Sequence, residues 1–355
     1  MSDRVPFCDL TRANHALRAD VDRAIAGVID RGWFLRGAEV DAFEAEWARY
    51  CGQIYCVSCN SGTDALTLAA TAMGMREAWV PANTLPLTAI GLNRSGAQIT
   101  ADEVGEDGRI LNVRAQSVPV LLYGRMPSQK ELECQLFDAA HAHGWKPPST
   151  ATACWSFYPT KSLGAYGDGG AITTNDSQMA ETMRALSGRD DQLRDRRQIT
   201  SRMDEIQAAI LRVKLRHLDD WLGERHRIAD LYLQWLPEDA RCVSTADDLH
   251  HLIVIRTERR DDLRTYLARQ GVESKVHFPQ PLHLQSASWG APNMRLPGAE
   301  SWCGSVLSLP CFPGITEAEV HRTCVMVSQF LANGHTSPKA GRRGHAASPG
   351  SGRCP

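Results

Sequence analysis

The amino-acid sequence predicts an α/β protein with a large domain on a mostly parallel sheet and a smaller α/β domain after it. From residue 55 to residue 174, short apolar segments without helical periodicity alternate with amphipathic helical segments. This alternation is typical of a parallel sheet covered by helices on both faces. The pattern changes after Pro237. We therefore expect a large domain over residues 1–236 and a small domain over residues 237–333.

Two helices are expected before the first strand. The first ends at Gly32, and its apolar positions recur on one helical face: Leu17, Val21, Ile25 and Val28. The second covers residues 37–52 and ends at Gly52. Both glycines are typical helix terminators.

Seven strands are expected in the large domain, at residues 54–59, 78–81, 97–102, 118–123, 135–140, 151–157 and 169–174. The helices between and after them are expected at residues 61–74, 86–94 and 176–186, the last with Asp176 as N-cap. Residues 201–236 keep helical periodicity for most of their length and are expected to form one long helix between the domains.

The small domain is expected to contain two strands and two helices. The strands are expected at residues 250–257 and 272–278, and the helices at residues 261–271 and 316–331. Residues 334–355 are rich in Gly, Ser, Pro and basic residues without periodic apolar positions, which predicts a disordered tail.

Composition excludes several classes of protein. The chain has 355 residues, 43% of them hydrophobic, and a formal net charge of −2, so it lacks the charge that attracts nucleic acids. No apolar run is long enough to span a membrane, and the N-terminal MSDRVPFCDL contains no apolar export signal. We therefore expect a cytoplasmic protein that acts on small molecules.

Lys161 stands alone in the neutral segment CWSFYPTKSLGAYGDGGAITT, in which Asp168 is the one acidic residue. A lysine in such a setting is either a buried ion-pair partner or an amine kept for chemistry. Lysine shifts its pKa readily when it is desolvated, and this makes it usable for Schiff bases.

An anion site is indicated where Ser61, Gly62 and Thr63 follow a strand and open a helix. The free N–H groups of a helix start favour an anion, and glycine lets a phosphate approach the backbone closely. The alternative is an ordinary Ser/Thr helix cap.

Asp138 ends an apolar strand, the position at which open α/β sheets bind their ligands. A buried carboxylate needs a cationic or N–H partner, and a pyridinium N–H would serve. His141 and His143 follow it, so a metal set of these three residues and a structural role are the alternatives. No further ligand completes a metal set, and we expect no metal.

The glycines at 164, 167, 169 and 170 precede a strand and do not form a dinucleotide fingerprint. Patterns for serine hydrolases, zinc proteases and P-loop kinases do not occur either. An anion seat, an Asp at a strand end and a lysine amine together meet the requirements of pyridoxal 5′-phosphate (PLP).

Six segments, in this order, resemble the DegT/DnrJ/EryC1/StrS family of sugar aminotransferases: NSGTDAL, FDAAHAHG, SFYPTKSLGAYGDGG, SRMDEIQAAILRVKL, HFPQPLHLQ and LSLPCFPGITEAEV. The resemblance extends from about Phe7 to about Leu331 and is most specific around Lys161. It implies a fold-type-I PLP-dependent transferase with a seven-stranded, mostly parallel sheet in the large domain. It also implies a homodimer whose shared active sites lie at the subunit interface.

The resemblance assigns roles to single residues. Lys161 falls on the Schiff-base lysine, Asp138 on the partner of the pyridinium nitrogen, and His141 beside the phenolic oxygen of the ring. The phosphate-binding positions are Gly62, Thr63 and Ser156.

Three departures from the family pattern stand out. Leu85 replaces an aromatic residue that stacks on the ring. Thr200 replaces an Asn that reaches into the partner subunit's site. The stretch 75–136 is shorter than usual.

The resemblance implies a PLP-dependent aminotransferase with L-glutamate as amino donor and a nucleotide-linked keto sugar as acceptor. The N-terminal segment and VPANT are most similar to members that aminate C3 of a dTDP-3-keto-6-deoxyhexose. The alternatives are C4 amination, amination of a cyclitol ketone, and a non-catalytic PLP-binding or regulatory homologue. A sugar dehydrase of the same fold is disfavoured, because such enzymes carry His at the position of Lys161.

Overall fold

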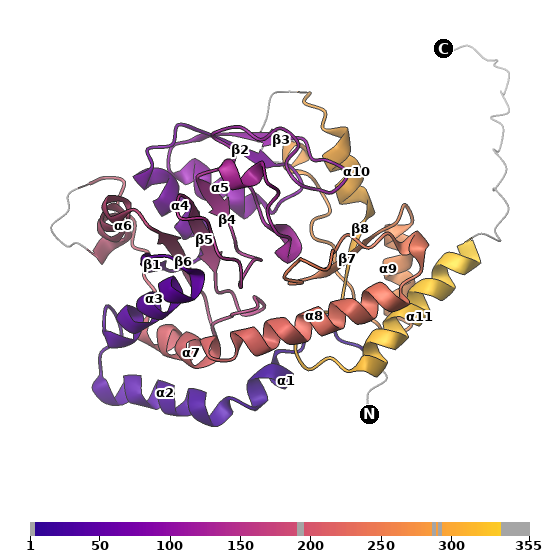
Figure 1. Cartoon of the computed structure of the whole chain (residues 1–355), viewed down its shortest axis with the longest axis horizontal. Coiled ribbons are helices and arrows are strands. Elements are labelled where there is room, and N and C mark those ends of the chain that lie inside the picture. The colour runs from indigo at the N-terminus through magenta and orange to yellow at the C-terminus, as the bar shows by residue number, and fades with distance from the viewer. Residues whose placement is uncertain (1–3, 190–194, 286–288, 290–292, 335–355) are drawn as a thin grey trace, which may run out of the picture.

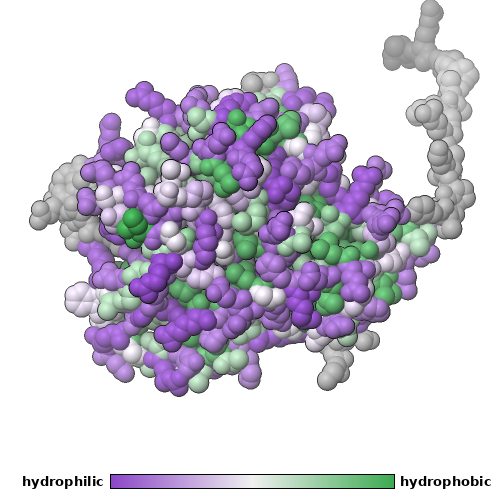
Figure 2. All heavy atoms as spheres, in the orientation of Figure 1, coloured by the Kyte–Doolittle hydropathy of each residue, from purple (hydrophilic) through white to green (hydrophobic). Residues whose placement is uncertain are grey.

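The computed structural model describes residues 4–189, 195–285, 289 and 293–334 (Figure 1). The tail expected at 334–355 lies outside the described residues apart from Gly334, which ends the last helix. None of the described helices combines the length and the apolar composition needed to cross a bilayer. The face of the molecule in Figure 2 is mainly hydrophilic.

The strands of the large domain belong to an α/β fold, as predicted, and their sheets are mixed. Four strands lie in the order β1 (Tyr55–Cys59), β6 (Gly170–Thr174), β5 (Thr152–Ser156) and β4 (Leu136–Asp138). A parallel pair, β2 (Glu77–Pro81) and β3 (Gln98–Asp102), continues this four-stranded sheet. β6 is antiparallel to both neighbours, whereas β4 and β5 are parallel.

The strand expected at residues 118–123 does not form as a regular strand. Single parallel bridges, Trp79 to Ser117 and Val120 to Asp138, connect this segment to β2 on one side and β4 on the other. Pro119 has no N–H to donate, which interrupts a continuous ladder. The segment still joins the two parts of the sheet.

Helices cover both faces of the sheet: α3 (Ala38–Cys51), α4 (Gly62–Ala72), α5 (Pro86–Arg94) and α6 (Ser177–Arg184) pack against its strands. Two further helices precede them, α1 (Leu10–His15) and α2 (Arg18–Arg31). Gly32 and Gly52 end α2 and α3 in the left-handed conformation, with φ of 65° and 70°. The Asp176 side chain accepts a hydrogen bond from the Met179 N–H and caps α6 as predicted.

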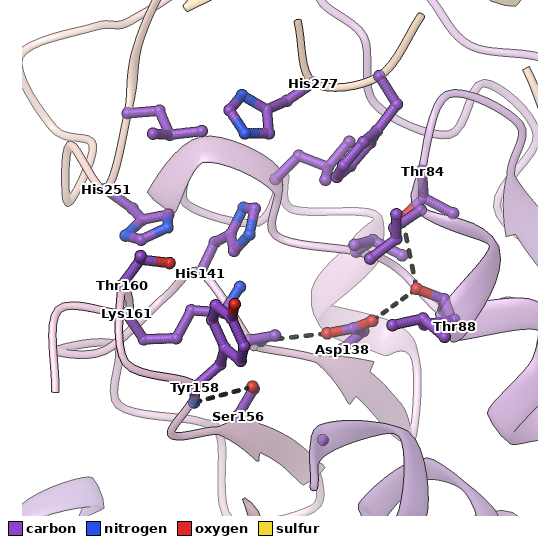
Figure 3. Close-up of a pocket in the computed structure, with 18 of the residues that line it drawn as sticks. Thr84, Thr88, Asp138, His141, Ser156, Tyr158, Thr160, Lys161, His251 and His277 are labelled. Atoms are coloured by element: carbon purple, nitrogen blue, oxygen red, sulfur yellow. Dashed lines mark hydrogen bonds between the residues drawn. The ribbon is translucent and has the colours of Figure 1, made fainter. Parts of the chain in front are cut away.

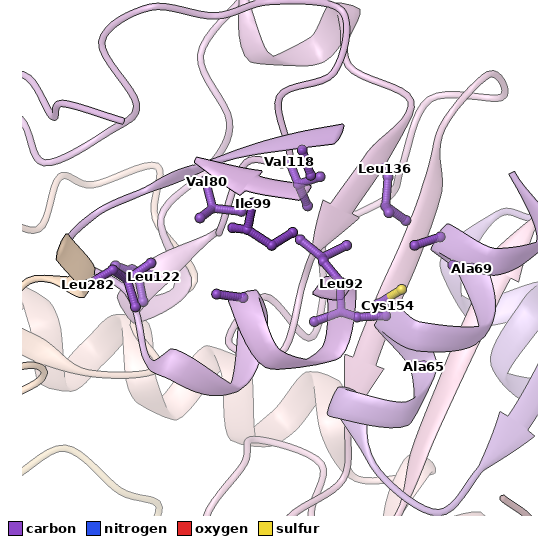
Figure 4. Packing of buried hydrophobic residues seen from close by; sticks show 14 of the residues in the cluster. Ala65, Ala69, Val80, Leu92, Ile99, Val118, Leu122, Leu136, Cys154 and Leu282 are labelled. Carbon is purple, nitrogen blue, oxygen red and sulfur yellow. The ribbon is translucent and has the colours of Figure 1, made fainter. Parts of the chain in front are cut away.

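Adjacent residues of β5 serve two different cores, because strand side chains alternate between faces. Cys154 belongs to one cluster with Ala65 of α4 and Leu92 of α5 (Figure 4). Trp155 packs on the opposite face with Trp47 of α3. Burial on both faces explains why β5 reads as a continuous apolar run.

The long helix expected over 201–236 is two helices. α7 (Glu205–Leu215) packs against α2 and α3, and α8 (Leu218–Trp235) packs against α11 (Figure 1). The break falls at His217, whose φ of −111° and ψ of 1° are not helical. The break therefore lies between a helix that packs on the N-terminal helices and a helix that packs on the last helix of the chain.

A second, two-stranded sheet forms beyond α8. β7 (Ile253–Arg256) pairs with β8 (Val306–Leu309), and the helices are α9 (Arg260–Arg269), α10 (Pro297–Ser305) and α11 (Glu317–Gly334). The strand expected at 272–278 does not form as a regular strand: Val272 bridges to Val5 and Lys275 bridges to Ser308 of β8, each as an isolated pair. Helix α10 and strand β8 were not expected. The division at residues 236 and 237 stays a prediction.

Short helical turns complete the fold. The 3-10 turns are Leu122–Gly124, Glu131–Glu133, Glu238–Ala240 and Leu282–Leu284, and Ala185–Arg189 forms a π-turn.

Candidate active site

A cavity of about 360 Å³ lies at the carboxyl ends of β4 and β5, beside the N-terminal ends of α4 and α5. Residues that follow α8 in the sequence close its other side, among them His251 and His277 (Figure 3). Open α/β sheets bind ligands at this edge. The volume is typical of cofactor sites, which span roughly 300–1,000 Å³.

Most of the residues predicted for the site line this cavity: Gly62, Thr63, Leu85, Asp138, His141, Ser156 and Lys161. They come from α4, α5, β4, β5 and the two loops after β4 and β5. The fold therefore brings together segments that are far apart in the sequence.

The N-terminal end of α4 faces the cavity. Ser61 caps the helix, because its Oγ accepts a hydrogen bond from the Asp64 N–H at 3.1 Å. The N–H groups of Gly62 and Thr63 lie in the first turn, where no carbonyl of the helix can accept from them. A helix cap by Ser61 and an anion site at the N–H groups of Gly62 and Thr63 are therefore compatible with each other.

Glycine is required where this turn meets the sheet. A Cβ added to Gly62 would lie 2.8 Å from the Cβ of Ser156, and one added to Gly170 would lie 2.3 Å from the backbone of Ser61. The start of α4 therefore packs directly on the ends of β5 and β6, with the Ser156 hydroxyl beside it.

Asp138 ends β4 as predicted, and its side chain is buried. The Thr88 hydroxyl donates to Oδ2 at 2.7 Å, and the Ala140 N–H donates to Oδ1 at 3.1 Å (Figure 3). Burial raises the pKa of Asp138, while these two donors and the charge of Lys161 act in the opposite direction. A cationic N–H facing the carboxylate would favour its charged form.

Lys161 lies in a tight loop after β5. Its backbone N–H donates to the Tyr158 carbonyl at 2.8 Å, and a Cβ on Gly164 would lie 2.3 Å from the Pro159 carbonyl oxygen. The side chain keeps some exposed surface toward the cavity, but the protein atoms crowded around it lower the pKa of Lys161 to about 8, against the charge of Asp138.

Within the described residues, Nζ of Lys161 forms no ion pair and no hydrogen bond. The structural ion pair is therefore not supported. An amine kept for chemistry stays a prediction, and the geometry around Lys161 is compatible with it.

Three histidines surround Lys161 on the side away from Ser156 (Figure 3). His141 accepts a hydrogen bond at Nδ1 from the backbone N–H of Tyr123 at 3.2 Å, and its ring lies 4.4 Å from that of His251 between centroids. Burial lowers the pKa of His277 to about 4 and the pKa of both other histidines well below the ordinary value. All three rings are therefore neutral near pH 7.

His143 is part of the hydrophobic core and does not line the cavity. It lies in the core against Trp47, Trp155 and Phe157, and burial lowers the pKa of His143 to about 3. No group of three His, Cys, Asp or Glu side chains in the described part of the chain could hold a metal. Asp138, His141 and His143 therefore do not form such a group.

Leu85 and Thr200, the two residues that depart from the family pattern, lie in different surroundings. Leu85 precedes α5 and lines the cavity with an apolar side chain. Thr200 is exposed and does not line the cavity of its own chain. The adjacent Ser201 instead binds the start of α4, donating to Asp64 at 2.7 Å and accepting from the Asn60 N–H at 3.0 Å. A role for Thr200 across a subunit interface stays a prediction.

Several cavity residues were missed from the sequence: Thr88, Tyr158, His251 and His277. Thr88 carried a signal, as a hydroxyl residue one turn into an apolar helix, and it is buried. His277 lies in HFPQPLHLQ, one of the segments that carried the resemblance. Nothing local distinguishes His251 from its neighbour His250.

The sequence matches the model of a known protein family and several of its members. The model of the DegT/DnrJ/EryC1/StrS aminotransferase family matches residues 15–116 and 129–328. The chain is 38% identical, over 92% of its length and 96% of the relative, to dTDP-3-amino-3,4,6-trideoxy-α-D-glucose transaminase of Streptomyces venezuelae. It is 32% identical, over 92% and 99%, to dTDP-3-amino-3,6-dideoxy-α-D-galactopyranose transaminase of Aneurinibacillus thermoaerophilus.

A solved structure shows the same fold. DesV of S. venezuelae, crystallised in complex with a ketimine intermediate, superposes with a TM-score of 0.87 at 36% identity. The match covers 93% of this chain and 99% of that one.

Proposed function

The chain belongs to the DegT/DnrJ/EryC1/StrS aminotransferase family, and from this premise we propose that it transfers the amino group of L-glutamate to C3 of a dTDP-linked 3-keto-6-deoxyhexose with PLP as cofactor. One observation carries the proposal. Lys161 lines a cofactor-sized cavity with a pKa of about 8, and Asp138 lies close enough to influence that value.

The residues of the cavity fit PLP. The start of α4 offers the N–H groups of Gly62 and Thr63, and the close approach to Ser156 leaves no room for a larger residue at position 62. Such a helix start suits a phosphate. Asp138, oriented by Thr88, suits a protonated ring nitrogen.

When bound, PLP supplies an aldehyde for the lysine amine and a ring that accepts the electron pair of a carbanion. Gly62, Thr63 and Ser156 hold the phosphate in this proposal. Asp138 keeps the ring nitrogen protonated through its negative charge. Because Nδ1 of His141 accepts from a backbone N–H, its neutral ring carries the proton on Nε2 and can donate to the phenolic oxygen.

Lys161 moves the proton. A group with a pKa near the working pH accepts and returns protons efficiently, and the pKa of Lys161 is about 8. Nζ takes a proton from the α-carbon of glutamate, and in the second half-reaction it delivers a proton to C3 of the sugar. The neutral histidines beside it add no competing positive charge.

Two relatives favour C3 and a dTDP-linked sugar, since the names of both transaminases place the amino group at C3 of such a sugar. Amination at C4, a cyclitol ketone as acceptor, and a non-catalytic homologue are the alternatives. The non-catalytic alternative rests on Leu85, which lines the cavity but offers a smaller surface for stacking on the ring than an aromatic residue. We also propose a homodimer with shared sites.

The test uses purified protein with PLP. We expect the absorption band of the lysine-bound cofactor to bleach when L-glutamate is added and to return when a dTDP-3-keto-6-deoxyhexose follows. Mass spectrometry and NMR of the product should show an amine at C3. An unchanged spectrum with both substrates would contradict an aminotransferase, and an amine at C4 would contradict the proposed position.

A further inference from the structure

Tyr123 has an unusual backbone conformation beside the cavity. It is buried, and its φ of 66° lies in the left-handed region that bulky residues rarely adopt. Such strain persists only where surrounding interactions hold it, and it is concentrated at functional sites. The interactions that hold Tyr123 therefore show what the turn does.

The backbone of this turn is held between two walls of the cavity. The Tyr123 N–H donates to Nδ1 of His141 at 3.2 Å, and the Tyr123 carbonyl accepts from the Leu252 N–H at 3.1 Å. The next residue, Gly124, has a φ of 87°, and a Cβ on it would lie 2.8 Å from the backbone nitrogen of His251 and 3.2 Å from the carbonyl oxygen of His141. The turn is thus wedged between His141 and His251.

The side chain of Tyr123 reaches the third histidine. Its hydroxyl donates to the backbone carbonyl of His277 at 2.5 Å and accepts from Nε1 of Trp302 at 3.1 Å. Burial raises the pKa of Tyr123, so the hydroxyl keeps its proton and remains a donor. The hydroxyl therefore ties the segment that carries His277 to the same turn.

The contact at Nδ1 has a chemical consequence for His141. A neutral imidazole has one donor and one acceptor nitrogen. Since Nδ1 accepts from a backbone N–H, the proton lies on Nε2, and the ring can act only as a donor there. One residue thus sets the tautomer of His141 through its backbone and the placement of His277 through its hydroxyl.

We propose that Tyr123 is a positioning residue that keeps His141 as an Nε2–H donor and holds His277 at the opposite wall of the cavity. The proposal rests on the proposed function for the chemistry that the two histidines serve. Tyr123 itself does not line the cavity, so it acts through these two residues.

Tyr123→Phe removes the hydroxyl and leaves the ring and the backbone N–H in place. Tyr232→Phe is the matched control, because Tyr232 is also buried and its hydroxyl also donates to a backbone carbonyl, that of Pro310 at 2.9 Å. Both variants lose a buried donation to a backbone carbonyl, and Tyr123→Phe also removes the acceptor of the Trp302 Nε1–H. Melting temperature and circular dichroism would establish that both remain folded.

The first measurement is ¹⁵N-histidine NMR of the PLP-free protein. We expect the wild-type spectrum to show His141 protonated at Nε2. In Tyr123→Phe the His277 signals should move more than those of any other histidine, whereas Tyr232→Phe should leave them unchanged. A His141 protonated at Nδ1, or His277 signals that do not respond to Tyr123→Phe, would overturn the proposal.

The second measurement is kinetic. A misplacement of about 1 Å in an active site costs up to about 100-fold in rate, so we expect Tyr123→Phe to lower kcat by roughly tenfold or more with little change in KM for glutamate. Equal losses in Tyr123→Phe and Tyr232→Phe would show a merely structural hydroxyl. If the NMR result holds but the wild-type protein has no transaminase activity, the proposed function fails and the positioning role stands.

Discussion

Asp138 and Lys161 influence each other's protonation across the cavity. Burial lowers the pKa of Lys161 to about 8, and the negative charge of Asp138 works against that lowering. Burial raises the pKa of Asp138, and the charge of Lys161 works against that raising. The lysine is therefore partly neutral near physiological pH, which a nucleophilic amine requires.

Replacing Asp138 by Asn tests its proposed role. Asp138→Asn removes the charge that keeps the ring nitrogen protonated but preserves an oxygen that can accept from Thr88 or Ala140. Loss of one well-placed electrostatic group costs about 10²–10³ in rate. We expect at least a 100-fold loss of transamination in a folded protein, and turnover within about threefold of wild type would exclude Asp138 as the partner of the ring.

The lowered pKa of Lys161 predicts a pH profile for cofactor loading. Only the neutral amine attacks an aldehyde, so the rate at which PLP-free protein forms the imine should rise with pH and level off above about 8, not above 10.5. Asp138→Asn removes a charge that raises the pKa of Lys161, so its midpoint should be lower. Lys161→Arg should show no imine formation at any pH, because a guanidinium cannot form the imine. A midpoint near 10.5 in wild type would argue against the desolvated amine.

At the scale of secondary-structure elements, the site depends on how α4 meets the sheet. Its first turn approaches the ends of β5 and β6 so closely that side chains are excluded at Gly62 and Gly170. The close approach places the helix N-terminus, with its unpaired N–H groups, beside the Ser156 hydroxyl. The same contact that fixes the packing also shapes the proposed phosphate site.

Gly62→Ala tests this contact. The added Cβ would lie 2.8 Å from the Cβ of Ser156, so one of the two elements must shift. We expect PLP binding to weaken by roughly tenfold, measured by fluorescence titration. Gly223→Ala is the control, because Gly223 lies in α8 with nothing within 4 Å of an added Cβ. Unchanged affinity in Gly62→Ala would show that the anion seat lies elsewhere.

The elements with strong local signals are predictable from the sequence. Glycines mark the ends of α2 and α3, Asp176 caps α6, and residues 86–94 form α5 as expected. The failures have tertiary causes. Helical periodicity continues across His217, so the break between α7 and α8, which pack on different partners, leaves no local mark. Segments 118–123 and 272–278 have strand-like composition but form only single bridges.

The site is predictable only where its residues carry a local sequence signal. Lys161, Asp138 and the start of α4 each stand out locally, by an isolated charge, by a strand end and by a helix-start sequence. His251, His277 and Tyr123 become neighbours of the site only when β7, β8 and their loops close the cavity. The strained turn at Tyr123 carries no composition signal, because tyrosine in an apolar segment reads as a strand residue.

At the scale of the whole molecule, three consecutive large apolar residues of the described chain are exposed. Trp33, Phe34 and Leu35 follow α2 and are exposed at 62%, 49% and 44%. Large apolar side chains that are contiguous on a surface mark interaction sites. We predict that a second copy of the chain covers this segment in the proposed homodimer.

Light scattering with size-exclusion chromatography tests the dimer. We expect a dimer at micromolar concentration, since an obligate interface buries upwards of ~2,000 Å². Phe34→Glu should shift the protein toward monomer and lower activity together. Leu111→Glu is the control, because Leu111 is a single exposed apolar residue, at 55%, in a loop. An active wild-type monomer would contradict shared sites.

The central claim is that Lys161 carries the cofactor, and borohydride reduction tests it most directly. Reduction of the PLP-loaded protein, followed by proteolysis and mass spectrometry, should find the cofactor mass on the peptide that contains Lys161. Lys214 provides an internal comparison, because it is a second buried lysine whose pKa burial lowers to about 8, but it donates to the Gly164 carbonyl and does not line the cavity. The account predicts the adduct at Lys161 and its absence in Lys161→Arg; an adduct at Lys214, or none on any lysine, would contradict it.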